Sequence, residues 1–307
     1  MRPSVILSEP YAGLQAQALG LAEAAGLTPE LMSLRPRVPW RWMSARTWPA
    51  PLRAVGLRDP GDAVVIGAGG TAAVVGSTLR RPGRPVVQVQ HPRIDPARFD
   101  LIVVNRHDGL TGPNVFVTRT ALHRATPARL AEAAAVWTPR LAHLPRPLVA
   151  VLVGGSNGRF RLDAAVATAL GASLAGMMQA DRVGLALTPS RRTSEDAQAA
   201  LRGAIAPLGG WMWDMDGENP YFGLLALADA IVVTEDSVSM VSEAVATSAP
   251  VLLAALPGRS RRIRRFNHHL QEDGRVRRFA GRLDLWPVTP IDDTQAAADE
   301  MRRRLDF

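Results

Sequence analysis

Hydroxyl and carboxyl side chains gather in a ten-residue segment that ends at Glu243 and directly follows an apolar run. The apolar run, residues 230–233, has the length and composition of a buried strand. Asp236 or Ser237 can cap a following helix, on which Ser239 and Glu243 lie one turn apart on the same face. The first turn of a helix binds phosphate because its free N–H groups and the helix dipole favour negative charge. We therefore expect Ser237 and Ser239 to contact a diphosphate and Glu243 to bind the hydroxyls of a ribose or a sugar.

Three further loops in the second half of the chain carry polar residues directly after apolar runs. They contain Gly154, Gly155, Ser156 and Asn157 after residues 148–153, Arg191 and Arg192 after 183–187, and Asn219 and Tyr221 after 210–213. Because ligands of parallel sheets bind at the carboxyl ends of the strands, we expect all four loops to form one nucleotide-diphosphate site. The first loop and the arginines would bind the diphosphate, and the Asn and Tyr would border the base or the sugar. Each loop alone is equally typical of a simple turn.

Short apolar runs alternate with helical segments throughout the chain, which predicts parallel α/β architecture in two halves that face a cleft. Strands are expected at 5–8, 63–66, 86–89 and 101–104 in the first half, and at 148–153, 183–187, 210–213, 230–233 and 251–255 in the second. A proline-rich linker at 144–147 separates the halves. We therefore expect an acceptor-side domain at 1–143, a nucleotide-sugar domain at 144–290 and a terminal helical segment at 291–307.

The first half offers candidates for a catalytic base. A sugar transfer that inverts the anomeric centre needs a base to deprotonate the acceptor hydroxyl. The candidates are Glu9, His91, His107 and Asp108, which follow apolar runs. For each of them, a loop residue bonded to the backbone is the plain alternative. The pattern Gly67-x-Gly69-x-x-Ala72 matches a dinucleotide fingerprint, but no acid follows the next apolar run to bind an NAD ribose. We therefore interpret these glycines as a tight turn near an acceptor or a sugar.

Lysine and cysteine are both absent, so all 36 residues counted as lysine or arginine are arginine. The absence of lysine excludes a Walker A lysine, a Schiff-base lysine, the Tyr-x-x-x-Lys pair of many epimerases and a lysine-dependent kinase. Without cysteine there is no disulfide, thiol nucleophile or zinc–thiolate site. The six histidines show no metal-ligand spacing, so we expect neither a metal nor a cofactor.

The net charge of +8 raises the question of a nucleic-acid partner. The arginines are interleaved with 28 acidic residues, and the chain has no basic tail and no nucleic-acid motif, so we expect no such partner. No apolar stretch reaches the length of a signal-peptide core or a membrane span, which predicts a cytoplasmic protein.

Three tryptophans, Trp40, Trp42 and Trp48, lie among five arginines between residues 35 and 53. This composition is typical of a membrane-interface patch or of a surface that stacks single-stranded nucleic acid. If the tryptophans are exposed, they would hold the protein peripherally on the inner, anionic face of the cytoplasmic membrane. The acceptor would then be a lipid-linked or lipopolysaccharide-type glycan. If they pack under the proline-rich loop, the segment is only structural.

Several of these segments together resemble one known family along nearly the whole chain. The matching blocks include Val87–Pro92, Arg106–Asp108, Thr188–Thr193, Gly217–Ala226, Asp236–Glu243 and Arg261–Phe266. They are similar to the ELM-type mitochondrial-fission family, whose bacterial members are described as glycosyltransferases of GT-B-like arrangement. The resemblance implies two Rossmann-like domains, the second holding a nucleotide sugar, and a terminal helix that crosses back to the first domain. Family members often carry aspartate where His91 stands, which favours His107 and Asp108 as the base.

The sequence therefore predicts a GT-B-type glycosyltransferase that moves a sugar from a nucleotide-diphosphate sugar to a glycan or lipid-linked acceptor without a metal. Arginines, backbone N–H groups and a helix dipole would stabilise the leaving diphosphate in place of a cation. A membrane-associated adaptor that retains the fold but has no catalytic activity is the alternative, because a fold alone does not establish function. An NAD-dependent epimerase is disfavoured by the absent lysine and the absent ribose-binding acid.

Overall fold

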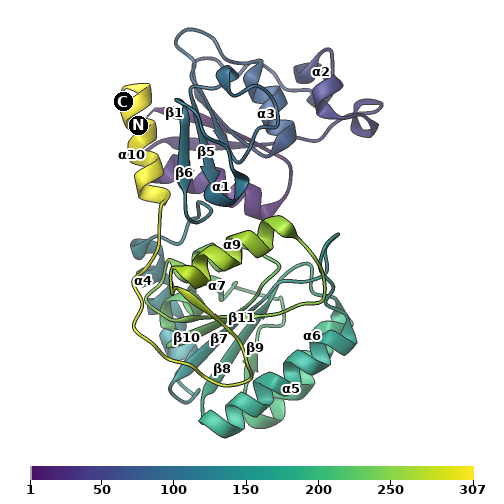
Figure 1. Cartoon of the computed structure of the whole chain (residues 1–307), viewed down its shortest axis with the longest axis vertical. Coiled ribbons are helices and arrows are strands. Elements are labelled where there is room, and N and C mark those ends of the chain that lie inside the picture. Colours follow the sequence, from purple (N-terminus) through teal and green to yellow (C-terminus); the bar gives the residue numbers. More distant parts are fainter. Residues whose placement is uncertain (1) are drawn as a thin grey trace. The chain divides into compact units, whose positions relative to one another are not determined.

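The computed structural model describes residues 2–307, which form two compact units (Figure 1). The first unit runs to Arg124 and includes the terminal segment Asp292–Phe307, and the second unit is Ala125–Ile291. The first boundary therefore precedes α4 (Pro127–Leu141) and does not follow residue 143 as predicted. Trp137 and Leu141 of α4 pack into the core of the second unit, so the helix belongs to the unit that its apolar face contacts.

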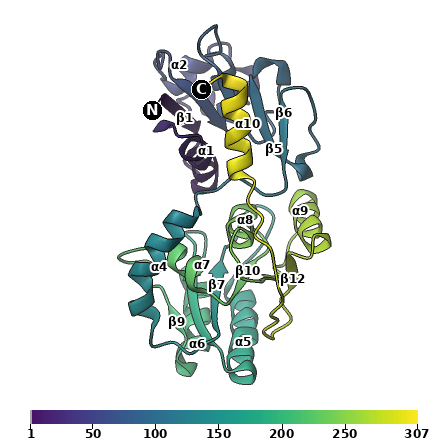
Figure 2. The ribbon, with the colours of Figure 1, turned by 90° about the vertical axis from the view of Figure 1, so that its left-hand side faces the viewer.

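The first unit is a six-stranded parallel sheet with helices on both faces. The strand order is β2-β1-β3-β4-β5-β6, with β1 at Pro3–Ser8, β2 at Thr28–Ser33, β3 at Val64–Ala68, β4 at Val86–Val89, β5 at Leu101–Asn105 and β6 at Val115–Thr118. One face is covered by α1 (Ala12–Ala24) and the terminal helix α10 (Thr294–Leu305), whose Met301 packs with Leu21 and Ile66 (Figure 2). The other face is covered by α2 (Pro51–Val55) and α3 (Gly70–Ser77).

The second unit is also a six-stranded parallel sheet. The strand order is β12-β11-β10-β7-β8-β9, with β7 at Leu148–Val153, β8 at Gly184–Pro189, β9 at Trp211–Met212, β10 at Ala230–Thr234, β11 at Val251–Ala254 and β12 at Val276–Arg278. One face packs on α5 (Ala164–Asp181) and α6 (Glu195–Ile205), and the other on α4, α7 (Tyr221–Leu227), α8 (Val238–Val245) and α9 (Arg261–Glu272). Because both faces are covered, the central strand β7 is an unbroken apolar run.

Five short 3₁₀ turns lie between these elements, at η1 (Trp40–Trp42), η2 (Ala45–Thr47), η3 (Pro96–Arg98), η4 (Arg106–Asp108) and η5 (Ala206–Leu208), as counted over residues 2–307. The predicted class of two Rossmann-like parallel sheets is confirmed. Each predicted strand is present within a few residues of its expected position, and the structure adds the edge strands β2, β6 and β12. The cleft expected between the halves stays a prediction.

The strand order of each sheet reverses at one point, and this point determines where a ligand can bind. In the first unit the strand order reverses between the neighbouring strands β1 and β3, and in the second unit it reverses between the neighbouring strands β7 and β10. In parallel sheets, the loops that follow the two strands at such a point run in opposite directions. Ligands commonly bind between these loops, at the carboxyl ends of the strands. The switch point of the second unit therefore lies between the loop after Val153 and the turn after Thr234.

Candidate functional site

The two turns at the switch point of the second unit are bonded to each other. Gly154 donates its backbone N–H to the Thr234 hydroxyl over 2.8 Å, and this hydroxyl donates in turn to Asp236 Oδ1 over 2.7 Å. Gly155 donates its N–H to Asp236 Oδ2 over a longer 3.4 Å. Asp236, whose side chain is fully buried, therefore connects the end of β10 to the loop that follows β7.

Gly154 and Gly155 have a different role from the one expected from the sequence. A Cβ atom at Gly154 would collide with the carboxylate of Asp236, and one at Gly155 would collide with the backbone of Arg192. Their N–H groups already donate to Thr234 and Asp236, and thus do not point at a ligand. These glycines build the turn and let the neighbouring loops approach.

Arg192 is held at the same point. Its Nη1 lies 2.8 Å from Asp236 Oδ2 and donates to the Gly155 carbonyl over 3.0 Å. The side chain of Arg192 is 38% exposed, so the guanidinium is anchored on one side and open to solvent on the other. Thr193 and Ser190 donate their hydroxyls to the Gly154 carbonyl, which fixes the loop after β8 against the loop after β7. Three of the four predicted loops thus meet.

The N-terminus of α8 follows this cluster directly. Ser237 caps the helix by accepting from the Met240 N–H over 3.4 Å, and Ser239 is half-buried in the first turn. The opposite end of α8 is fixed by Arg275, whose buried guanidinium donates to the carbonyls of Thr247 and Ala249. Burial lowers the pKa of Arg275 to about 10, so it remains a cation at neutral pH and complements the helix dipole.

Glu243 lies deeper on α8 and is bonded to the start of α7. The Tyr221 hydroxyl donates to Glu243 Oε2 over 2.5 Å, and Asn219 accepts from the Tyr221 N–H over 3.0 Å. The structure therefore brings Asn219, Tyr221 and Glu243 together. Burial raises the pKa of Glu243 to about 7, although the hydrogen bond from Tyr221 opposes this rise. Burial, with the neighbouring charge of Glu243, also raises the pKa of Tyr221 well above its usual value.

Ser156 and Asn157 lie on the exposed part of the loop after β7. Ser156 Oγ accepts from the Leu162 N–H over 2.9 Å. Asn157 Oδ1 accepts from the N–H groups of Arg159 and Phe160 over 2.9 and 3.0 Å. Both side chains therefore shape the loop that leads into α5, and Arg191 stands exposed in the neighbouring loop.

In the first unit, Glu9 and His91 follow strands at or beside the switch point. Glu9 is half-buried at the end of β1. His91 is flanked by Gln90 and Arg93, which both adopt left-handed backbone conformations with φ of 71° and 62°. His91 Nδ1 accepts from the Arg93 N–H over 3.0 Å, so a neutral His91 ring carries its proton on Nε2. In this conformation Nε2 is a hydrogen-bond donor and not a base.

His107 and Asp108 lie in η4, after β5, two strands away from β3 in the sheet. The two side chains are at most 2% exposed, with His107 Nε2 3.7 Å from Asp108 Oδ1. A direct contact with an acceptor hydroxyl would require this turn to move. The sequence shows a polar turn after a strand, but it does not show that the turn folds inward.

The three tryptophans differ in exposure. Trp48 is buried, and its indole N–H donates to the Trp40 carbonyl over 3.1 Å. Trp40 is half-buried, whereas Trp42 is 69% exposed next to the exposed Val38 and Met43. The condition that all three tryptophans are exposed is therefore not met, and the surface patch is Val38–Met43.

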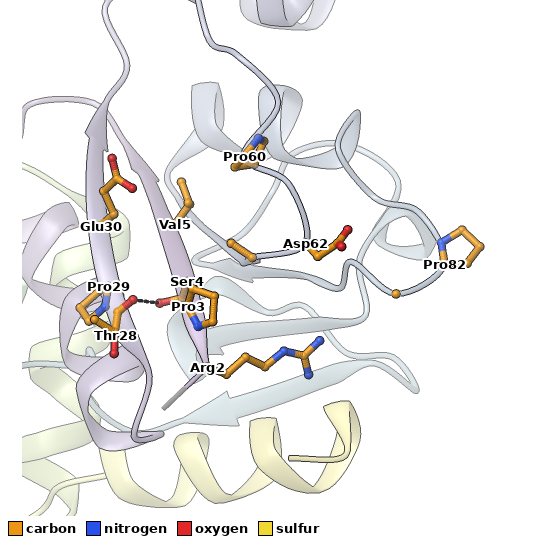
Figure 3. Close-up of a pocket in the computed structure, with 12 residues that line it drawn as sticks. Arg2, Pro3, Ser4, Val5, Thr28, Pro29, Glu30, Pro60, Asp62 and Pro82 are labelled. Carbon is orange, nitrogen blue, oxygen red and sulfur yellow. Dashed lines mark hydrogen bonds between the residues drawn. The ribbon is translucent and has the colours of Figure 1, made fainter.

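A cavity of about 780 Å³ lies in the first unit at the amino ends of the strands, on the side of the sheet away from the switch-point loops (Figure 3). It is lined by the amino ends of β1 and β2 and by four prolines, with Arg2, Glu30 and Asp62 as its charged residues. Parallel sheets bind ligands at their carboxyl ends, so this cavity does not belong to the candidate site.

Two sequence comparisons give relatives of this chain. The profile of the family described as mitochondrial fission ELM1 matches residues 12–305. The mitochondrial fission protein ELM1 of Arabidopsis thaliana is 34% identical over 278 residues, which cover 80% of this chain and 64% of that protein. The chain thus spans less than two thirds of the length of the curated relatives that it matches.

Solved structures show the same fold at low sequence identity. The UDP-GlcNAc 2-epimerase of Methanocaldococcus jannaschii, in complex with UDP-GlcNAc and UDP, gives a TM-score of 0.58 at 11% identity and 100% coverage of both chains. A UDP-glucosyltransferase from Polygonum tinctorium gives a TM-score of 0.52 at 13% identity, with 100% of this chain and 93% of that chain covered. The likeness confirms the predicted GT-B-like fold.

Proposed function

The chain belongs to the mitochondrial fission ELM1 family, and we propose that its second unit binds a nucleotide-diphosphate sugar and that the protein transfers the sugar without a metal. The observation that carries this proposal is the position of Arg192. A buried carboxylate, Asp236, holds the guanidinium at the switch point of the sheet, and the next residue, Ser237, caps α8. Parallel sheets bind nucleotides at such points.

The diphosphate would lie over the first turn of α8. Free N–H groups and the helix dipole attract anions there, and the Ser237 and Ser239 hydroxyls can donate to phosphate oxygens. Arg191 and the open side of Arg192 supply positive charge. Two arginines and a helix N-terminus can neutralise a leaving diphosphate as a divalent cation does in other transferases.

The ribose or the sugar would lie beside Glu243, which is 8% exposed, so this contact requires the start of α7 to move away from the carboxylate when the ligand binds. A carboxylate accepts hydrogen bonds from two vicinal hydroxyls, and Tyr221 holds one carboxylate oxygen in place. Asn219, at the start of the same helix as Tyr221, would border the base or the sugar. The Polygonum tinctorium and Methanocaldococcus jannaschii proteins are named for UDP-linked sugars, and their fold supports a ligand of this class here.

Nucleotide binding tests the proposal directly. Calorimetric titration with a panel of nucleoside diphosphates should give saturable binding of at least one of them, and Arg192→Gln should weaken it about tenfold or more because a charge-assisted hydrogen bond is lost. Arg282→Gln is the matched control, since Arg282 forms an ion pair with Asp181 beside the end of α5. Wild-type protein that binds no nucleotide, or equal weakening by both variants, would remove the basis of the assignment.

The acceptor would be activated in the first unit by Glu9. It is the carboxylate nearest in sequence to the switch point of that sheet, directly after β1, whereas His107 and Asp108 are buried. Glu9→Gln should lower the rate of transfer by about a hundredfold or more, because a general base contributes 10²–10⁴. Nucleotide affinity should not change. A variant with the wild-type rate would exclude Glu9 as the base.

A non-catalytic adaptor is the second candidate function. The name of the Arabidopsis relative, a mitochondrial fission protein, and the burial of His107 and Asp108 both favour it. An adaptor of this kind would show no hydrolysis and no transfer with any nucleotide sugar, even at enzyme concentrations that allow a single turnover. Release of nucleoside diphosphate under these conditions would favour the transferase.

We also propose that the first unit contacts an anionic membrane through Val38–Met43, where a lipid-linked acceptor would be available. The patch places an exposed Trp42 among the exposed Arg35, Arg37, Arg41 and Arg46, and the chain carries no acid between Glu30 and Asp59. Tryptophan partitions into the bilayer interface, and each arginine near an anionic surface adds about 1 kcal/mol. None of the helices within residues 2–307 has the length and apolarity needed to cross a membrane.

Vesicle sedimentation tests this contact. Vesicles that contain anionic lipid should bind the protein, neutral vesicles should bind it weakly, and Trp42→Ala should reduce binding about threefold to tenfold. The control is Leu285→Ala, since Leu285 is a similarly exposed apolar residue of the second unit. Binding that is indifferent to lipid charge, or reduced equally by both variants, would mean that the patch has no such role.

A further inference from the structure

A polar cavity of about 520 Å³ lies in the second unit at the carboxyl ends of β11 and of the edge strand β12. One wall is α9, which carries the arginine-rich stretch that the proposed function does not use (Figure 1). The lining residues that matter are Arg261, Arg264, Arg265, Asn267, His268 and Arg278. A volume of this size fits a small ligand, because ligand cavities in proteins span about 300–1,000 Å³.

The cavity has an excess of positive charge. Positions 261, 264, 265 and 268 lie on one face of the helix, and Arg278 closes the cavity from the end of β12. Within residues 2–307, the side chains of the four arginines have no ion pair and no hydrogen bond. Its two acids are already engaged: Glu235 accepts from the Leu256 N–H over 3.1 Å, and Glu272 lies 3.4 Å from His268.

Asn267 provides an independent sign of a ligand. The residue is 5% exposed, and its Nδ2 donates to the Glu235 carbonyl over 3.2 Å. Because this carbonyl can only accept, it fixes the orientation of the amide, with Oδ1 as the remaining acceptor. Asn267 Oδ1 is buried and has no partner. Such a group normally has a hydrogen bond, and no group of the residues described here donates to this oxygen.

We propose that this cavity binds a phosphate ester that carries a hydroxyl group. The arginines bind the phosphate through charge-assisted hydrogen bonds, and Asn267 Oδ1 accepts from the hydroxyl. An arginine face that is merely solvated would not account for a buried, unpartnered acceptor on a residue that lines the same cavity. The site is separate from the proposed nucleotide site, since the turn after β10 presents Glu235 to this cavity and Asp236 to Arg192.

Calorimetry with glucose 6-phosphate and with inorganic phosphate tests the site. Glucose 6-phosphate should bind saturably and more tightly than inorganic phosphate. The double variant Arg264→Gln/Arg265→Gln should weaken this binding about a hundredfold, on the order of tenfold for each lost charge-assisted bond. Arg262→Gln, on the same helix but outside the cavity lining, should bind as the wild type does. Asn267→Ala should remove the preference for the ester, with its folding checked by circular dichroism.

The same chemistry can come from a free ester or from a lipid headgroup, so vesicles of phosphatidylglycerol form a second arm. If the headgroup is the source, the double variant sediments less with these vesicles and glucose 6-phosphate displaces the wild type from them. If the free ester is the source, the wild type and the double variant bind the vesicles equally, and the double variant still binds glucose 6-phosphate more weakly in calorimetry. No saturable binding in either arm, or an equal loss in Arg262→Gln, overturns the proposal. Nucleotide affinity should be unchanged in the double variant, so a failure here leaves the nucleotide site unaffected.

Discussion

Asp236→Ala should abolish nucleotide binding and lower the free energy of unfolding by about 3 kcal/mol. The Asp236 carboxylate is fully buried and accepts from the Thr234 hydroxyl, the Gly155 N–H and the Arg192 guanidinium. Alanine removes the acceptor shared by these three donors at the point where the two loops meet, and leaves the Thr234 hydroxyl and the Gly155 N–H buried without it. The loss is smaller than for a fully buried ion pair because Arg192 is partly exposed and can be hydrated.

Urea unfolding and nucleotide titration of the same variant measure both effects. Asp236→Asn is the matched control, because asparagine keeps the shape of the side chain and one acceptor oxygen. Its amide N–H group replaces the other oxygen and faces a donor, so one hydrogen bond is lost. We expect an intermediate loss for it. Arg192→Gln should cost less stability than Asp236→Ala, because Gln can still donate a hydrogen bond to the Asp236 carboxylate, and it should still weaken nucleotide binding. An Asp236→Ala protein with the wild-type unfolding midpoint would contradict the role given to this carboxylate.

The protein should lose stability as pH rises from about 4.5 to about 7 because of Glu243, and Glu243→Gln should remove this loss. Burial raises the pKa of Glu243 from 4.5 to about 7 in the folded protein. Between these two values the folded state binds more protons than the unfolded state, so the stability that the raised pKa confers is complete below pH 4.5 and is lost through pH 7. The full span corresponds to about 3 kcal/mol at 1.36 kcal/mol for each pKa unit.

Urea unfolding of both proteins between pH 4.5 and pH 8 tests this prediction. The two stability curves should diverge with rising pH, and the Gln variant should be the more stable protein at pH 8. Glu218→Gln, at an exposed carboxylate of the neighbouring loop, should follow the wild type. Nucleotide affinity of the wild type should rise through pH 7, because the ionised carboxylate is the stronger acceptor of ribose hydroxyls. Parallel curves for the wild type and Glu243→Gln would contradict the assignment.

The central strands of both sheets and the edge strand β9 could be predicted from the sequence, and the other edge strands could not. Strands such as β7 and β10 are buried on both faces, so they are continuous apolar runs. The edge strands β2, β6 and β12 are partly exposed, and none of them contains more than three consecutive apolar residues. The boundary at Arg124 was also not predicted. It depends on tertiary contacts, because the packing of Trp137 in the core of the second unit determines that α4 belongs to that unit.

The site shows the same limit. Residue types predicted which loops meet at the carboxyl ends of the second sheet, and the Tyr221–Glu243 hydrogen bond lies among the residues so chosen. The central role of Asp236 was not predicted. An acidic residue directly after a strand can cap the next helix or can be buried between two loops, and the sequence pattern is the same in both cases. Burial likewise separates His107 and Asp108 from Glu9, and burial depends on contacts with distant parts of the chain.

A crystal structure of the complex with the tightest-binding nucleoside diphosphate tests the central claim most directly. We predict that the diphosphate lies over the first turn of α8, within hydrogen-bond distance of Ser237 and of the open side of Arg192. The ribose hydroxyls, or those of a bound sugar, should contact Glu243. A nucleotide seated elsewhere, for example in the cavity beside α9, with the first turn of α8 occupied only by water, would contradict the account.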